Sequence, residues 1–172
     1  MIICRKITGK YLNKKQQERI TSIWEVFGPD DSKDSHSYKR DIFFLVYKNK
    51  KIVAAGRLQP RKVRFNNKSY SVLGIADIAS EEKGKGYGRV LMEKLRNYLV
   101  KNNETGVGFC AARNSGFYQK MNFTTDRELF KRFYSKNHED KEDDFIFFLE
   151  GKTKLISDML KIRGEAEIDW FW

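Results

Sequence analysis

The chain has 172 residues, 40% hydrophobic and 14% aromatic, which predicts one domain, residues 1–172, with a continuous core. No run approaches the roughly 20 apolar residues of a membrane span, and the start lacks a signal-peptide core, so we expect a cytoplasmic protein with no membrane partner. The net charge of +11 favours an anionic partner, but the lysines are dispersed, so nucleic acid, an acidic surface and a polyphosphate cofactor all remain open.

The first half of the sequence predicts a strand, a helix and then a strand meander. Leu12–Phe27 predicts a helix because Ile20, Ile23, Trp24 and Phe27 recur at helical spacing, and Gly28-Pro29 ends it. Residues 28–40 form a polar loop, and Asn66-Asn67 offers a turn between two long strands. The predicted strands of this half are residues 1–7, 41–47, 51–65 and 68–79.

The second half mixes helices and strands. A helix over Tyr87–Asn102 has Leu91, Leu95, Tyr98 and Leu99 on one face. The later elements are a strand at 105–110, a short helix at 115–121, an extended region after Asn122-Phe123, a strand at 145–149 and a weak helix at 154–161. This order predicts an α/β (α+β) fold with a mixed sheet, and the consecutive early strands disfavour a purely parallel one.

The two cysteines, Cys4 and Cys110, are far apart, belong to no CxxC pair and have no histidine cluster beside them. We therefore expect no disulfide and no metal site. Cys110 ends an apolar run and is assigned to the core.

A glycine-rich run, Lys83-Gly84-Lys85-Gly86-Tyr87-Gly88, lies between a predicted strand and a predicted helix. Alternate glycines let the backbone approach a ligand, and the helix N-terminus, Lys83, Lys85 and Arg89 add positive charge, so the run favours a phosphate site. It is neither a Walker loop nor a GxGxxG fingerprint. On these residues alone, a flexible strand-to-helix turn is the alternative.

Residues 78–89, IASEEKGKGYGR, resemble the acetyl-CoA signature of the GNAT acetyltransferase superfamily, Arg/Gln-x-x-Gly-x-Gly/Ala. Lys83 stands where Arg or Gln is usual, and Ser80 where proline is common. Residues 114–123, NSGFYQKMNF, resemble the superfamily's FYxKxGF segment, with Asn122 in place of glycine. The resemblance extends over about residues 40–125.

The resemblance implies a mainly antiparallel sheet of about six to seven strands, flanked by about four helices and splayed between strands four and five. It implies acetyl-CoA as the acyl-donor substrate, with the end of the fourth strand on the pantetheine arm and loop N–H groups on the pyrophosphate. The residues it assigns to acetyl-CoA are Ile78, Ala79, Ser80, Lys83, Gly84, Lys85, Gly86, Tyr87, Gly88, Arg89, Asn114 and Phe117. Asn114 has an alternative role as the N-cap of its helix.

Two catalytic candidates follow from the resemblance. Tyr118 matches the tyrosine that protonates the departing thiolate, which suits a phenol with an ordinary pKa of about 10; simple packing beside Phe117 is the alternative. The acceptor amine must lose a proton, for which the sequence offers Asp77, Asp169, the carboxylate of Trp172, or water. Asp77 is an isolated acid in an apolar strand, so it is either a base or a structural residue at a bulge.

The sequence leaves the acceptor open. Residues 142–147 and the final Trp172 resemble, more distantly, the aminoglycoside 2′-N-acetyltransferases, but Gly74 stands where those enzymes carry a glutamate. Six acids either gather at the cleft mouth for a cationic acceptor or form a solvated surface. They are Asp140, Asp143, Asp144, Glu165, Glu167 and Asp169.

We expect acetyl transfer to the primary amine of an unidentified small molecule or peptide, by a monomer or homodimer. One alternative is a non-catalytic acyl-CoA-binding protein of the same fold. Another is a nucleic-acid-binding module, favoured by the basic and aromatic run at residues 130–134 but accompanied by no known nucleic-acid motif.

Overall fold

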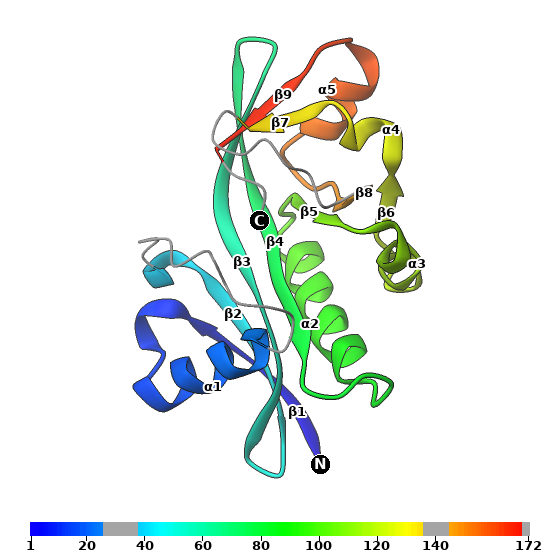
Figure 1. Ribbon diagram of the computed structural model, residues 1–172. Coiled ribbons are helices and arrows are strands. Elements are labelled where there is room, and N and C mark those ends of the chain that lie inside the picture. Colours follow the sequence, from blue (N-terminus) through cyan, green and yellow to red (C-terminus); the bar gives the residue numbers. More distant parts are fainter. Residues whose placement is uncertain (26–37, 136–144, 170–172) are drawn as a thin grey trace. The chain divides into compact units, whose positions relative to one another are not determined.

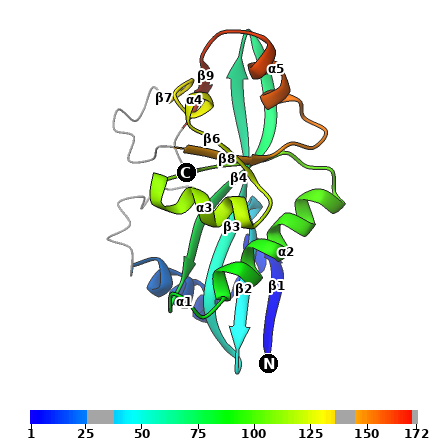
Figure 2. The same cartoon turned by 90° about the vertical axis from the view of Figure 1, so that its right-hand side faces the viewer.

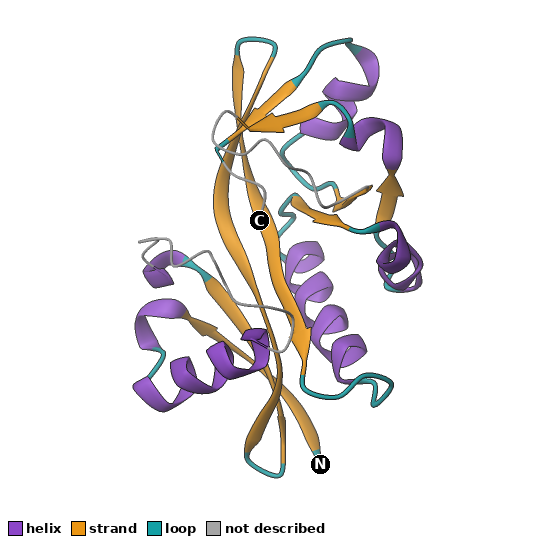
Figure 3. Cartoon of the chain, in the orientation of Figure 1, coloured by secondary structure: helices purple, strands orange, loops and turns teal. Residues whose placement is uncertain are grey.

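A computed structural model describes residues 1–25, 38–135 and 145–169. Figure 1 labels its helices and strands, and Figure 3 colours them by type. In chain order they are β1 (Ile2–Thr8), a 3-10 turn (Gly9–Tyr11), α1 (Lys14–Trp24), a second 3-10 turn (Tyr38–Arg40), β2 (Ile42–Lys48), β3 (Lys51–Phe65), β4 (Lys68–Ser80), α2 (Tyr87–Lys101), β5 (Gly106–Cys110), α3 (Ala112–Lys120), β6 (Thr124–Asp126), α4 (Arg127–Phe130), β7 (Phe133–Ser135), β8 (Phe145–Leu149), α5 (Leu155–Lys161) and β9 (Ala166–Ile168).

The contacts divide the chain into two compact units, each made of two stretches of sequence. Unit 1 contains Met1–Gln59 and Ala76–Leu95, and unit 2 contains Pro60–Ile75 and Arg96–Trp172. The long strands β3 and β4 and the helix α2 each contribute to both units. The assignment of one domain to the chain stays a prediction.

In unit 1, β1, β2 and β3 pair as an antiparallel meander, from Ile2↔Lys48 in the first ladder to Lys48↔Lys51 at the hairpin. The hairpin turn, Asn49-Lys50, has φ values of 48° and 68°, the left-handed geometry that matches strand twist in a tight hairpin. α1 and the first half of α2 cover opposite faces of these strands (Figures 1 and 2).

α1 is shorter than the sequence indicates. It begins at Lys14 because Asn13 caps it: the Asn13 side chain accepts from the Gln16 N–H at 2.9 Å, and the Gln16 side chain accepts from the Asn13 N–H at 3.0 Å. Its Ile20 and Ile23 pack with β-strand residues such as Phe43 in one buried cluster. The predicted Gly28-Pro29 stop lies outside the described residues.

The predicted helix over Tyr87–Asn102 is confirmed as α2, and its Leu91, Leu95 and Leu99 have no exposed surface. β3 faces α2 closely at Gly56, where an added Cβ would lie 2.5 Å from the Ile78 side chain. A larger residue at position 56 would therefore require the Ile78 side chain to move.

In unit 2, β4 and β5 run parallel, while β5–β8, β8–β6 and β3–β9 pair antiparallel. The parallel ladder holds two residue pairs, Leu73↔Gly106 and Gly74↔Val107, although β5 continues to Cys110 and pairs with β8 along its whole length. This short ladder agrees with the expected splay between the fourth and fifth strands. The expected mixed, mainly antiparallel fold is confirmed.

The described residues form a nine-stranded sheet and five α-helices, more than the sequence predicts. The extended region predicted after Asn122-Phe123 contains β6, and the additional elements are the three-residue strands β7 and β9 and the four-residue helix α4. These elements are too short to show a hydrophobic period. The unit 2 core nevertheless uses them: Phe133 of β7, Ala166 of β9 and Leu129 of α4 are buried in one cluster with Phe65 and Met159. The predicted turn at Asn66-Asn67 is confirmed, with φ values of 48° and 61°.

Candidate functional site

The glycine loop between β4 and α2 is an exposed turn whose backbone only glycine adopts easily. Gly84 and Gly86 have φ values of 78° and 76°, in the left-handed region that costs other residues about 1–2 kcal/mol. A Cβ added at either position would meet no atom within 4 Å. The loop therefore presents bare backbone to open space, which is what close approach of a ligand requires.

The first turn of α2 adds unshared N–H groups to this surface. The first intrahelical bond joins the Val90 N–H to the Gly86 carbonyl at 3.1 Å, so the N–H groups of Tyr87, Gly88 and Arg89 precede the helical ladder. Aligned peptide dipoles make this end of a 15-residue helix electropositive. The loop and helix together suit an anion such as a diphosphate.

Basic side chains surround the same loop. Lys83, Lys85 and Arg89 are exposed. Arg89 forms a 2.8 Å ion pair with Glu93 one turn along α2, and this hydrogen bond raises the pKa of Arg89 above its ordinary value. Arg89 is thus oriented along the helix surface, whereas Lys85 extends from the loop itself.

The end of β4 alternates between core and surface. Ala79 is buried in the α1-side cluster, whereas Ile78 and Ser80 are half-buried. The Ser80 hydroxyl donates to the Glu82 carbonyl at 3.4 Å. Ser80 at the usual proline position therefore still forms a turn that leads into the glycine loop.

Asp77 belongs to an ion-pair network within unit 1. It has a φ of 54° in the middle of β4, and its carboxylate accepts from Nε of Arg57. Nη1 of Arg57 also donates to fully buried Asp41 at 2.8 Å, and Trp24 Nε1 donates to the Asp77 carbonyl at 2.9 Å. These contacts give Asp77 the bonded partners that the structural alternative requires, and its role as a base stays a prediction.

Sequence reasoning missed Asp41 and Arg57. Arg57 has 7% exposure in an otherwise apolar stretch of β3, and its guanidinium lies 4.6 Å from the ring centre of Tyr38. A charge inside a buried strand is itself a signal, because such a group is costly to bury without partners.

In unit 2, Tyr118 is held by aromatic stacking. It is 8% exposed, its ring lies 3.7 Å from that of Phe147 with an interplanar angle of 11°, and Phe117 contacts it edge-on at 5.3 Å. The packing alternative is therefore present, and it also fixes the ring in one orientation.

α3, which carries Tyr118, begins earlier than predicted, at Ala112 rather than Ser115. Its N-cap is Ala111, without a side-chain cap. The N-cap role considered for Asn114 is therefore wrong: Asn114 lies in the first turn and is exposed, which leaves its side chain available for a ligand.

The segment after α3 explains the departure from the FYxKxGF pattern. Asn122 has a φ of 59°, and the Phe123 N–H donates to the Tyr118 carbonyl at 3.1 Å, closing the helix in the manner of a glycine C-cap. Asparagine tolerates this conformation better than most residues. Asn122 therefore keeps the turn that a glycine would make.

The remaining described acids that the sequence singles out belong to unit 2: Asp169, a candidate proton acceptor, and Glu165 and Glu167, two of the six acids considered for the cleft mouth. Asp169 is exposed, and its carbonyl accepts from the Ser135 hydroxyl at 3.0 Å. Glu165 is exposed, whereas Glu167 pairs with Arg64 at 3.6 Å. Asp140, Asp143 and Asp144, which complete the six acids, and the carboxylate of Trp172, a candidate proton acceptor, lie outside the described residues.

Other features bear on cofactors and location. Within residues 1–25, 38–135 and 145–169, no group of three or more His, Cys, Asp or Glu is placed to hold a metal ion. None of the helices described there is long and apolar enough to span a bilayer. Cys110 is buried, as predicted, and burial raises the pKa of half-buried Cys4 to about 11.

Comparisons with known proteins agree with this geometry. A family model described as an acetyltransferase (GNAT) domain matches residues 10–125, whereas no curated protein matches the sequence. Escherichia coli ElaA is similar in structure at 17% identity and a TM-score of 0.64, over 87% of this chain and 100% of that one.

Two further similar structures contain coenzyme A. The catalytic domain of the Tetrahymena GCN5 histone acetyltransferase has a TM-score of 0.60 at 15% identity, over 87% of this chain and 93% of that one. The Bacillus subtilis N-acetyltransferase YlbP has a TM-score of 0.50 at 18% identity, over 89% and 99%. With the fold, the glycine loop and the family match in agreement, the chain belongs to the GNAT acetyltransferase family.

Proposed function

We propose that the protein is an acetyl-CoA-dependent N-acetyltransferase that transfers acetyl directly to a primary amine of a small molecule or peptide. The observation that carries the proposal is the glycine loop: exposed backbone at Gly84 and Gly86 with open space beside it, followed at once by the N-terminus of α2. This arrangement fits the diphosphate of coenzyme A better than a neutral ligand.

Different residues bind different parts of acetyl-CoA. The N–H groups from Gly84 to Arg89 hold the diphosphate, and Lys83 and Lys85 add charge. Ile78, Ala79 and Ser80 at the end of β4 pair with the pantetheine arm. Asn114 and Phe117 of α3 are the candidate acetyl-CoA contacts that unit 2 carries. Acetyl-CoA supplies the acetyl group as an activated thioester.

Proton transfer is assigned to two groups. The Tyr118 hydroxyl donates a proton to the departing thiolate sulfur, a role for which its fixed ring is suited. The acceptor amine loses its proton to water or to a carboxylate. Asp77 is one candidate carboxylate, but its bond to Arg57 makes it less available to accept a proton. Asp169 is the other described candidate, and it is exposed.

The distant resemblance to aminoglycoside 2′-N-acetyltransferases does not extend to their glutamate. Gly74 occupies that position, buried in β4 and paired with Val107, so it supplies no carboxylate. We therefore propose no aminoglycoside acceptor.

The experiment that tests the proposal measures release of free CoA thiol from acetyl-CoA in the presence of a panel of primary amines, including polyamines, amino acids and lysine peptides. We expect amine-dependent thiol release and an acetylated product by mass spectrometry. Gly86→Glu is expected to abolish both, because it adds a side chain and a negative charge to the phosphate site.

The outcome separates this proposal from its two rivals. A protein that binds CoA but releases no thiol with any amine is the non-catalytic binding protein of the same fold. A protein that binds DNA or RNA in a salt-dependent manner, unaffected by Gly86→Glu, is the nucleic-acid module.

A further inference from the structure

The β2–β3 hairpin contacts both ends of the glycine loop. Lys48, the last residue of β2, donates from Nζ to the hydroxyl of Tyr87 at 2.9 Å. Lys51, the first residue of β3, pairs with Glu81 at 2.6 Å. Glu81 precedes the loop and Tyr87 follows it, so two lysines of one hairpin reach its two ends, and all four residues belong to unit 1.

The register makes this arrangement specific. Lys48 and Lys51 are directly opposite in the β2–β3 ladder, so their side chains project from the same face. Like charges at directly opposite positions destabilise a sheet. The bonds to Tyr87 and Glu81 offset that repulsion by taking the two ammonium groups to different partners.

Each contact is supported by further bonds. The Glu81 carboxylate also pairs with Arg19 of α1 at 2.7 Å, and Arg19 Nε donates to the Ile52 carbonyl of β3 at 2.9 Å. The hydrogen bond from Lys51 lowers the pKa of Glu81. The Tyr87 ring is 2% exposed, so its hydroxyl has a fixed position from which to accept.

Resting on the proposed function, we infer that Lys48 and Lys51 are positioning residues that hold the glycine loop in its coenzyme-binding conformation. The loop between these contacts is exposed and contains two glycines, the residue type that loses most conformational freedom on ordering. Fixing its ends beforehand lowers the entropy that coenzyme binding must overcome.

The test measures the dissociation constant for CoA by titration calorimetry, and KM and kcat for acetyl-CoA. Lys48→Gln and Tyr87→Phe each remove the same bond, and Tyr87→Phe does so without changing charge. We expect about threefold weaker CoA binding for each, because the bond from the exposed Lys48 side chain contributes little. The double variant should bind no more weakly than either single variant, because both substitutions remove the same bond.

The second contact is tested in the same way. Glu81→Gln weakens both ion pairs of Glu81 and is expected to weaken CoA binding about fivefold. The double variant Lys48→Gln, Lys51→Gln is expected to weaken CoA binding about tenfold. In both variants kcat should stay within about twofold of the wild-type value. Hydrogen exchange of the amides at 82–88 in ligand-free protein is expected to quicken in this double variant, a change that mere loss of attraction for CoA does not produce.

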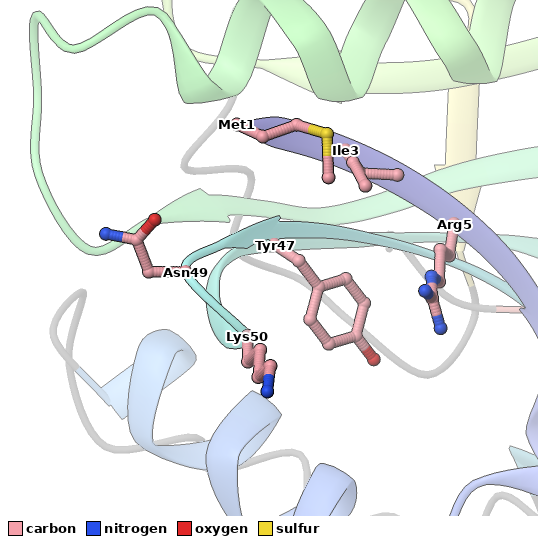
Figure 4. Close-up of a pocket in the computed structure, with 6 residues that line it drawn as sticks. All are labelled: Met1, Ile3, Arg5, Tyr47, Asn49 and Lys50. Carbon is pink, nitrogen blue, oxygen red and sulfur yellow. The ribbon is translucent and has the colours of Figure 1, made fainter.

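Lys50→Asn is the matched control. Lys50 lies in the same hairpin turn with a φ of 68°, which asparagine tolerates, and the substitution removes the same charge. Figure 4 shows its side chain extending toward α1, beside a pocket of about 520 Å³ that Arg5 and Tyr47 also line. We expect CoA binding within about twofold of wild type.

Three results would overturn the inference. If Tyr87→Phe binds CoA as tightly as the wild-type protein, the Lys48–Tyr87 bond has no positioning role. If Lys50→Asn and Lys48→Gln lose CoA affinity equally, the loss of one positive charge explains the effect and the Lys48 contact does not. Wild-type affinity in the double lysine variant removes the positioning role while the proposed function stands. If the wild-type protein does not bind CoA, the proposed function fails, and the coenzyme role of the hairpin fails with it.

Discussion

The glycine loop and α3 carry the two recognisable motifs of this chain, and they are built in opposite ways. The loop is exposed, with glycines at positive φ, an ion pair at Glu81 before it and a hydrogen bond to the Tyr87 hydroxyl after it. α3 holds its key side chain in the core, with Tyr118 stacked on Phe147, which is 1% exposed. A group that binds by its backbone needs open space, whereas a group that acts by one side-chain atom needs a rigid ring.

The largest expected effect tests the side-chain half of this contrast. Tyr118→Phe keeps the ring on Phe147 and removes the hydroxyl, so we expect kcat to fall about 100-fold or more, while CoA affinity and melting temperature stay close to wild type. Steady-state kinetics and calorimetry measure both. Tyr11→Phe, at a tyrosine with 66% exposure, is the control, and an unchanged kcat in Tyr118→Phe would remove this residue from the mechanism.

A smaller effect is expected in the loop. Gly86→Ala places a Cβ on a backbone with a φ of 76°, and the strain and the added methyl group together should weaken CoA binding about tenfold. Gly116→Ala is the matched change in α3, where an added Cβ also meets open space. There we expect about 0.5–1 kcal/mol of stabilisation and unchanged CoA affinity. Equal CoA affinity in the two variants would contradict the backbone role of the loop.

The turn after α3 gives a third, purely structural test. Asn122→Ala should lower the free energy of unfolding by about 1 kcal/mol, because alanine tolerates a φ of 59° less well than asparagine. Asn122→Gly should change it by only a few tenths of a kcal/mol. Urea unfolding measures both, and an equal loss in the two variants would show that the Asn122 side chain, not its backbone, stabilises the turn.

The smallest effect is a pH dependence at the start of the loop. The hydrogen bond from Lys51 lowers the pKa of Glu81 below its ordinary value of 4.5. The ion pair therefore contributes fully above that pH, and its contribution is lost as the pH falls through the lower, folded-state pKa. The difference in unfolding free energy between wild type and Glu81→Gln should be under about 1 kcal/mol at neutral pH. It should shrink in acid, and a difference that grows in acid would contradict this pairing.

Much of the fold follows from the sequence, where apolar runs are long. β3 and β8 begin and end where the sequence predicts, because each contains a continuous run of apolar residues. α2 ends one residue early, and its apolar residues recur at helical spacing. The two hairpin turns, Asn49-Lys50 and Asn66-Asn67, have the left-handed backbone that short hairpins require.

What the sequence does not show depends on contacts between distant residues. The parallel pairing of β7 with β9 joins two three-residue strands about 30 residues apart. Arg57 of β3 bonds to Asp41, the residue before β2, and to Asp77 of β4. The opposition of Lys48 and Lys51 is local, but their partners at 81 and 87 follow only from the register of the folded sheet.

The division of the sequence between the two units has a consequence for dissecting this protein. The chain passes from one unit to the other after Gln59, after Ile75 and after Leu95, so no single cut releases either unit as one continuous peptide. Expression of the first 95 residues alone would leave the 60–75 hairpin without its partners. A split version of this protein should therefore be divided within a loop, and the two fragments should be produced together.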